Sequence, residues 1–215
     1  MSNLQQIFKS THQRDSEKGQ IVLYQGEITE NMFYIESGYI KVYDILESGN
    51  EKLLMILGPG DIFPLIWSFE KNEPLHYFYE TIEPSKINLT SRKNLINSVK
   101  NDHELAYSTL QYFVNRSDNL MNRLECIDST SAKHKVAQVL YYLSHAHGKP
   151  DKVGWLKIQP EITQQSIADM AGITRETASI QLKHLEESCI YSNDNDELLV
   201  NHEGLESFLQ KSEVN

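Results

Sequence analysis

Arg175 and Glu176 are the two residues whose types and spacing most directly indicate a chemistry. An arginine can pair with O6 and N7 of guanine, and a glutamate can accept a hydrogen bond from N4 of cytosine. Both stand at the expected start of a helix that reads R-E-T-A-S-I-Q-L-K-H-L-E-E. Side chains at such a helix start can reach base edges in the major groove of DNA. The pair therefore indicates base reading.

Two short helices around a tight turn are predicted over residues 159–187. Thr163 is expected to cap the first helix and Thr174 the second, because a hydroxyl can accept from the free N–H groups of a first turn. Small Ala168 and Gly172 let two helices cross closely, which is typical of a DNA-binding helix-turn-helix; an ordinary helical hairpin is the alternative. The residues expected to contact DNA are Thr163, Gln164, Gln165, Thr174, Arg175, Glu176, Thr177, Ser179, Ile180 and Lys183.

A β-hairpin is predicted directly after the second helix. Residues 189–201 hold two apolar runs, 190–191 and 198–200, on either side of a polar Asn/Asp turn. A last short helix is expected over 203–209. This order suits the winged variant of the helix-turn-helix.

The first half of the chain has a different sequence pattern. Short β-type runs alternate with glycine turns, which predicts a sandwich, jelly roll or small barrel. The expected strands cover residues 21–24, 32–36, 39–46, 52–57 and 76–82, with short helices over 4–8 and 90–101. The whole is an α+β fold: an N-terminal double-stranded β-roll, a long helix and a C-terminal winged helix-turn-helix.

The long helix is the expected dimerisation element. Its apolar positions recur at alternating intervals of three and four, which is the seam of a coiled coil. The seam residues are Leu110, Phe113, Ser117, Leu120, Leu124 and Ile127. A long helix packed within one subunit is the alternative. A dimer would present two recognition helices about one DNA turn apart, so it would read a palindrome.

Three segments follow from these elements. Residues 1–102 form the roll, 103–128 the dimerisation helix and hinge, and 129–215 the DNA-binding domain, with D-S-T at 128–130 as the hinge. A further helix is expected over residues 132–148, ended by Gly148 and Pro150.

Composition bounds the function. No apolar run approaches membrane-spanning length and the start of the chain lacks the features of a signal peptide, so we expect a cytoplasmic protein with no membrane partner. Cys126 and Cys189 are too far apart in sequence to indicate a metal or iron-sulfur framework, and we expect no cofactor. The net charge of −10 is unusual for a DNA-binding protein, and residues 129–215 hold eight Lys and Arg against twelve Asp and Glu. Basic residues must therefore gather on one face.

In this order of elements the chain resembles the CRP/FNR family of bacterial transcription regulators. The resemblance covers nearly the whole chain, and it is strongest over residues 162–187, I-T-Q-Q-S-I-A-D-M-A-G-I-T-R-E-T-A and its continuation. The stretch G-P-G-D-I-F at 58–63 adds to it. The resemblance implies a homodimeric, sequence-specific regulator, with RNA polymerase as a further partner.

Two positions depart from the family pattern. Many members carry a second arginine within R-E-T-x-x-R, where this chain has Ile180, so one guanine contact is either missing or replaced by an apolar contact such as one with a thymine methyl. Cyclic-nucleotide-binding members hold the ribose with a glutamate and the phosphate with an arginine. Leu65 stands at the place of that glutamate, and Leu75 with His76 at the place of the Arg-Ser pair. Cyclic AMP is therefore not the expected effector.

A small-molecule effector is still an option, because apolar and aromatic side chains are dense around the same place. They either line a pocket for a weakly charged effector or fill the space and leave the regulator constitutive. The candidate pocket residues are Phe63, Pro64, Leu65, Trp67, Leu75, His76 and Tyr77. We expect no enzyme activity. The alternatives are a cupin-like metalloenzyme, which needs several histidines inside the roll, and a ligand-binding signalling module without DNA binding.

Overall fold

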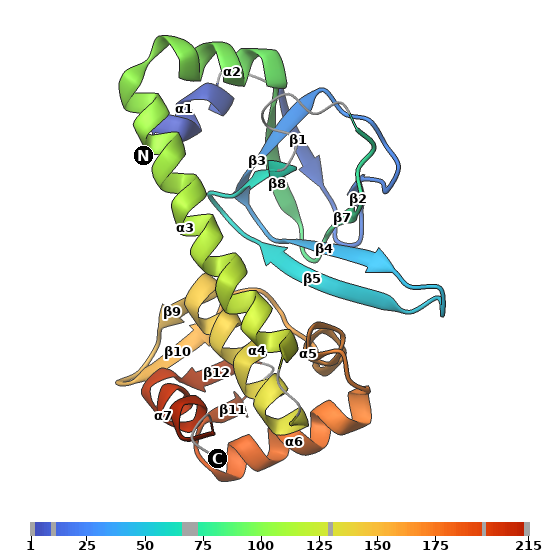
Figure 1. Ribbon diagram of the computed structural model, residues 1–215, viewed down its shortest axis with the longest axis vertical. Coiled ribbons are helices and arrows are strands. Elements are labelled where there is room, and N and C mark those ends of the chain that lie inside the picture. Colours follow the sequence, from blue (N-terminus) through green and yellow to red (C-terminus); the bar gives the residue numbers. More distant parts are fainter. Residues whose placement is uncertain (1–2, 10–11, 66–72, 129–130, 195–196, 213–215) are drawn as a thin grey trace. The chain divides into compact units, whose positions relative to one another are not determined.

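The computed structural model describes residues 3–9, 12–65, 73–128, 131–194 and 197–212 (Figure 1). In the described part of the chain no helix is both long and apolar enough to cross a membrane.

The chain forms two compact units. The first holds Met1–Asn50 with Leu54–Arg116, and the second holds Glu51–Leu53 with Ser117–Asn215. Helix α3 (His103–Asp128) begins where the predicted dimerisation segment begins. The division between the units falls inside this helix, whereas the sequence placed it at the hinge, two of whose residues lie outside the described ones.

The first unit is a β-roll made of two antiparallel sheets. Their orders are β1-β8-β3-β6 and β2-β7-β4-β5 (Figure 1). The strands are β1 (His12–Ser16), β2 (Ile21–Leu23), β3 (Asn31–Ser37), β4 (Ile40–Ile45), β5 (Glu51–Leu57), β6 (Ile62–Phe63), β7 (Phe78–Thr81) and β8 (Ser85–Ser91), and only the first three residues of β5 are grouped with the second unit. This confirms the expected roll.

Strand β3 is buried on both faces, since side chains alternate across a strand. Phe33 and Ile35 point into the roll, where they join side chains of both sheets in one apolar core. Met32 and Tyr34 point out of the roll and pack with helices α1 (Asn3–Lys9), α2 (Arg92–Asn101) and α3. The helices therefore cover the outer face of the first sheet.

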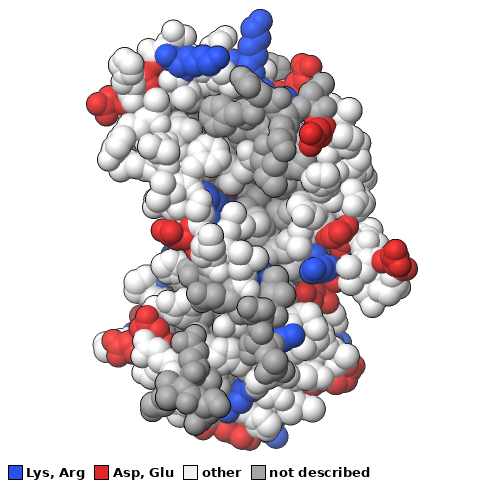
Figure 2. Space-filling view, viewed as in Figure 1, with Lys and Arg blue, Asp and Glu red and all other residues white. Residues whose placement is uncertain are grey.

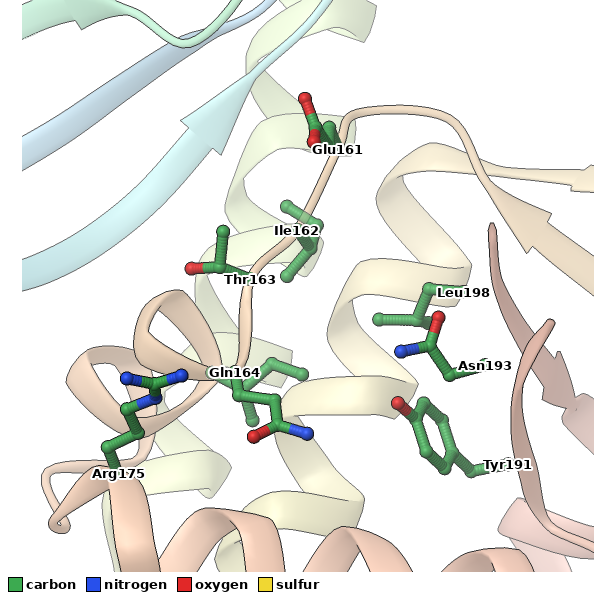
Figure 3. A pocket seen from close by; sticks show the side chains of 9 residues that line it. Glu161, Ile162, Thr163, Gln164, Arg175, Tyr191, Asn193 and Leu198 are labelled. Carbon is green, nitrogen blue, oxygen red and sulfur yellow. The ribbon is translucent and has the colours of Figure 1, made fainter. Parts of the chain in front are cut away.

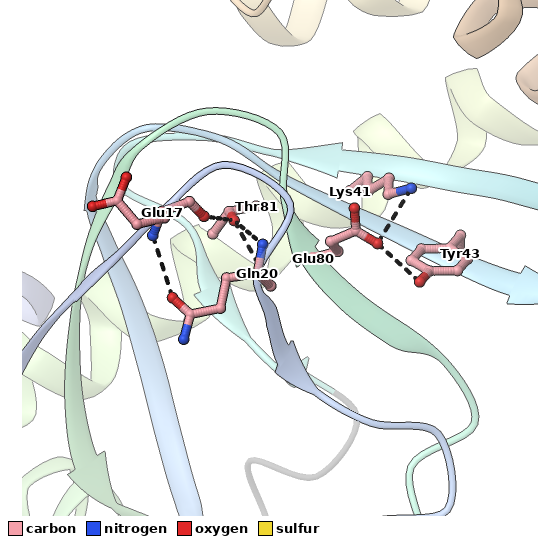
Figure 4. A network of polar contacts seen from close by, with 6 residues as sticks. All are labelled: Glu17, Gln20, Lys41, Tyr43, Glu80 and Thr81. Atoms are coloured by element: carbon pink, nitrogen blue, oxygen red, sulfur yellow. Dashed lines mark hydrogen bonds and ion pairs between the residues drawn. The ribbon is translucent and has the colours of Figure 1, made fainter.

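Hydrogen bonds join the end of β7, in the second sheet, to the loop that precedes β2 (Figure 4). The Thr81 hydroxyl donates to the backbone carbonyl of Glu17 and accepts from the backbone N–H of Gln20. On the outer face of the sheet, Glu80 accepts a hydrogen bond from Tyr43 at 2.9 Å and pairs with Lys41 at 3.4 Å. These groups satisfy one another, which indicates a structural role.

The second unit is a winged helix-turn-helix. Its sheet has the order β11-β12-β10-β9. The elements are α4 (Ala132–His147), β9 (Gly148–Pro150), β10 (Trp155–Ile158), α5 (Gln164–Ala171), α6 (Arg175–Glu187), β11 (Tyr191–Asp194), β12 (Glu197–Asn201) and α7 (His202–Ser212). Val136, Val139, Leu140 and Leu143 of α4 are fully buried, as their spacing on one helical face predicts.

The sequence missed strands β1, β6, β8, β9 and β10. Strand β1 is the polar run H-Q-R-D-S, which has no apolar alternation to mark it. The end of β8 was assigned to the following helix, which begins two residues later than the predicted start, with Ser91 as its N-cap. Residues 148–150 were interpreted only as the end of a helix, although they form β9.

Candidate nucleic-acid interface

Helix α5 and the turn after it are built as the sequence predicts. Thr163 caps the helix and accepts from the backbone N–H of Ser166 at 3.0 Å. Gly172 ends the helix with φ of 64°, a left-handed conformation that glycine adopts without steric cost. Ala168 is completely buried, and its carbonyl accepts from the backbone N–H of Ile173. The turn is thus tight enough to bring α6 across α5.

Helix α6 buries one face and exposes the other. Thr174 caps it by accepting from the backbone N–H of Thr177 at 3.2 Å. Ala178, Leu182 and Leu185 form the buried face, with at most 1% of each side chain exposed. Glu176, Ile180 and Lys183 lie on the exposed face. This is the arrangement of a helix that can enter a groove.

Some of the ten predicted contact residues are occupied within the fold. Besides the two threonine caps, the hydroxyl of Thr177 lies 3.0 Å from that of Thr174. The amide of Gln165 donates to Asp169 at 2.7 Å. These side chains order the helix starts, so their loss would affect folding as well as recognition.

Four other predicted side chains are left without a polar partner. Across the residues that the structure describes, the polar groups of these four make no hydrogen bond or ion pair. They are Gln164, Arg175, Ser179 and Lys183. Donors at the start of α5 and along α6 that make no bond within the fold are available to an external partner.

Two adjoining hollows separate the helix-turn-helix from the wing (Figure 3). The first has a volume of about 370 Å³ and the second about 330 Å³, and both are lined by Gln164, Tyr191 and Asn193. Figure 3 shows Gln164 and Arg175 on one side of the first hollow and the two β11 side chains on the other. The second hollow extends along α6 past Ser179 and Lys183.

Tyr191 and Asn193 were not among the predicted contact residues. They stand two apart on β11, so both point to the same side of the strand, and that side faces the hollows. Burial raises the pKa of the Tyr191 phenol to about 12, with a further contribution from Glu186. The alternation of the hairpin could have revealed the pair, but only once its register was known.

The charges at the interface are mixed. Arg175 and Lys183 supply two cations, while Glu161 lines the first hollow and Glu186 the second. The exposed carboxyl of Glu176 has a pKa below its usual range, because its own backbone N–H and the Thr174 hydroxyl donate to the carboxylate and Arg175 lies nearby. A lowered pKa keeps this carboxylate ionised, as an acceptor for a cytosine amino group must be.

Basic side chains do not form a broad patch on the face seen in Figure 2. They appear there as separate spots among uncharged and acidic residues. With a net charge of −10, the chain has little nonspecific attraction for phosphates. Recognition would therefore depend on specific contacts more than on charge.

The predicted effector-pocket residues are placed differently from one another. Phe63 and Leu75 are almost fully buried in the roll core, Pro64 is buried and Leu65 half-buried. Phe63 stacks between Phe33 and Tyr79, at centroid distances of 5.2 and 5.3 Å.

The remaining pocket residues lie toward the surface or beyond the described chain. His76 is exposed and Tyr77 half-buried, while Trp67 lies outside the described residues. Among the described residues no group of three His, Cys, Asp or Glu side chains is arranged to hold a metal ion.

Two family models match the chain. A cyclic nucleotide-binding domain matches residues 13–102, and a Crp-like helix-turn-helix domain matches residues 134–208.

Individual regulators are similar to the chain over most of its length. The CRP-like cAMP-activated global transcriptional regulator of Mycobacterium tuberculosis is 27% identical over 165 residues, covering 77% of this chain and 73% of that protein. The HTH-type transcriptional regulator ArcR of Staphylococcus haemolyticus is 28% identical over 190 residues, covering 85% and 79%. The structure of FixK2 from Bradyrhizobium japonicum matches 91% of this chain and 96% of its own, with 19% identity and a TM-score of 0.74.

Proposed function

The chain belongs to the CRP/FNR family of transcription regulators, and we propose that it binds a palindromic DNA site as a homodimer through two copies of helix α6. The observation that carries this proposal is the exposed face of α6. Arg175 and Lys183 are exposed there and Ser179 is half-buried beside them, and the side chains of these three make no hydrogen bond or ion pair with the described residues. Base edges and phosphates supply the partners that these side chains lack.

The roles of the side chains follow from their chemistry. Arg175 reads a guanine and Glu176 a cytosine, while Lys183 contacts phosphate. Gln164 and the wing residue Asn193 face the hollows beside α6, where they can donate to the DNA backbone. These contacts fix the position of the helix but carry no sequence information.

An exposed apolar stripe on α3 supports the dimer. It lies opposite the face that Leu105 and Thr109 bury, and it repeats at intervals typical of a coiled-coil seam. Its apolar members are Tyr107, Leu110, Val114, Met121 and Leu124, each more than half exposed. A contiguous exposed apolar stripe of this kind is typical of a surface that a protein partner covers.

The stripe differs in detail from the predicted seam. Leu110 and Leu124 belong to both, Ser117 is exposed between them, and Leu120 is 45% exposed. Phe113 is half-buried and packs edge-on against Tyr112, while the side chain of Ile127 lies outside the described ones. We therefore propose that the seam is centred on Val114 and Met121, on the side of Leu110 away from Phe113.

The apolar interior of the roll argues against cyclic AMP as the effector. Leu75 is buried in an apolar core at the place where cyclic-nucleotide-binding members carry an arginine, and Leu65 stands where they carry a glutamate. An apolar site cannot compensate for the desolvation of a cyclic phosphate. The roll suits a weakly charged effector or none, and RNA polymerase is the proposed protein partner of the DNA-bound dimer.

Selection from random duplexes tests the proposal. The purified protein is expected to enrich a sequence with two-fold symmetry, at low salt because the chain is acidic. Cyclic AMP is expected to change neither the enriched sequence nor the affinity for it. Failure to enrich any palindrome, with or without candidate effectors, would contradict DNA binding by α6.

A further inference from the structure

Ile180 is the large apolar side chain on the exposed face of the recognition helix. It is 55% exposed, whereas Ala178 and Leu182 on the buried face are at most 1% exposed. At 3.6 residues per turn, Ile180 lies about 160° around the helix axis from both of them. It therefore stands near the middle of the face that meets solvent, with Glu176 one turn before it and Lys183 one turn after it.

This position contributes little to the stability of the isolated chain. Isoleucine has a lower helix propensity than lysine, arginine or alanine, and an exposed side chain adds little packing energy. A protein partner would be recognised by a larger apolar patch, but Glu176 and Lys183 flank this side chain. We therefore expect Ile180 to act by contacting a small apolar group of a binding partner at the centre of α6.

The major groove offers one apolar group on its base edges. The C5 methyl of thymine projects into the groove, while the edges of the other bases present hydrogen-bond donors and acceptors. At this place a side chain without donors or acceptors makes the free energy of binding more favourable when it contacts a methyl group. It makes binding less favourable when it contacts a polar base edge, because that edge loses its bound water and gains no new hydrogen bond.

We propose that Ile180 reads a thymine methyl, so that each half-site carries a thymine at the base that faces the centre of α6. The inference rests on the proposed function, because it requires α6 to lie in the major groove. It makes Ile180 a specificity-determining residue beside the polar pair at the helix start.

Replacement of thymine by deoxyuridine tests this directly, because it removes only the methyl. The probe is the duplex enriched by selection, in which each thymine is exchanged in turn for dU at both symmetric positions. At one position, the exchange should weaken binding by the wild-type protein by about tenfold, since each half-site loses the burial of one methyl. Fluorescence anisotropy at fixed salt gives the dissociation constants.

Two variants assign the effect to its residue. Ile180→Ala should bind the thymine and dU duplexes with equal affinity, and it folds because the site is exposed and alanine favours a helix. His184→Ala, the matched control, changes an exposed α6 residue on the same side as Ile180 that is outside the predicted contact set, and it should keep the full preference for thymine. Cytosine at the same position should weaken wild-type binding, and 5-methylcytosine should recover part of the loss because it restores the methyl.

The outcomes separate the two proposals. If no palindrome is enriched, the proposed function fails. If a palindrome is enriched but no thymine shows a methyl effect that depends on Ile180, the function stands and the assignment of Ile180 is overturned. An enriched half-site with no thymine overturns it as well.

Discussion

The guanidinium of Arg116 lies 3.0 Å from the carboxylate of Asp61, which joins helix α3 to the residue that precedes strand β6. Both side chains are largely buried, with 14% and 12% exposed. One turn earlier on α3, the Tyr112 hydroxyl accepts from the backbone N–H of Ile62 at 2.8 Å. The strand that leads to Phe63 and Pro64 is thus held to the proposed dimer helix by two contacts within one unit.

Removing one partner of this pair should destabilise the roll. Arg116→Met leaves the Asp61 carboxylate buried without its cation, and we expect a loss of about 3 kcal/mol in the free energy of unfolding. Urea unfolding followed by circular dichroism measures it. The exposed pair Lys157–Glu197 is the control, because Lys157→Met should cost less than about 1 kcal/mol. Equal losses for the two variants would contradict a special role for the buried pair.

The cost of Arg116→Met should depend on pH. Burial raises the pKa of Asp61 above its ordinary value of 3.8, while Arg116 and the backbone N–H of Gly58 oppose the rise. Because the folded-state pKa is raised, protonation of Asp61 favours the folded state. This contribution to the free energy of unfolding is complete below pH 3.8 and is lost as the pH rises through the folded-state pKa. Without Arg116 the pKa rises further, so the stability difference between variant and wild type should be small in acid and grow toward neutral pH. Urea titrations over this range measure it, and a difference that is constant with pH would exclude linkage through Asp61.

The threonine caps should contribute to folding independently of DNA. Thr174→Ala removes the acceptor for the Thr177 N–H, and we expect it to lower the free energy of unfolding by about 1 kcal/mol. Thr174→Ser keeps a hydroxyl and should restore most of the loss. If both variants unfold like the wild type and differ only in DNA affinity, Thr174 is a contact residue and not a cap.

Local signals predicted the helix-turn-helix because each of its features depends on neighbouring residues. Thr163, Gly172 and Thr174 occupy the caps and the turn as expected, and the buried face of α6 follows from its 3.6-residue period. The contribution of Tyr191 and Asn193 could not be seen in the same way. It depends on the pairing of β11 with β12 and on the packing of the wing beside α5, which are nonlocal.

In the roll, too, structure that depends on nonlocal pairing could not be predicted from local sequence patterns. Its apolar strands were predicted, but the polar strand β1 is held by its pairing with β8 and not by a pattern of its own. The seam on α3 was predicted from spacing alone. Leu105, Thr109 and Tyr112 lie on the side of α3 that faces the interior of the first unit. Their packing determines which of the two neighbouring apolar stripes of α3 faces outward.

Charge placed in the exposed stripe of α3 should abolish the dimer. Leu110→Glu combined with Leu124→Glu puts like charges on both helices of the proposed seam, and we expect a monomer in sedimentation equilibrium. Asn115→Glu adds a charge on an exposed flank of the same helix and should leave the dimer intact. A monomeric wild type, or a dimer that tolerates both seam charges, would contradict this interface.

Arg175→Ala should separate base reading from folding. The Arg175 guanidinium makes no hydrogen bond or ion pair with the described residues and only a solvent-exposed electrostatic interaction with Glu176, so the free energy of unfolding should change by less than about 0.5 kcal/mol. Binding to the selected duplex should weaken by about 1 to 3 kcal/mol, and a new selection should show one guanine position relaxed, because the bidentate contact is lost. Lys183→Ala should instead weaken binding to all sequences alike and reduce the salt dependence, as expected for a phosphate contact. If Arg175→Ala also lowers affinity evenly over all sequences, Arg175 binds the backbone and another residue of α6 reads the guanine.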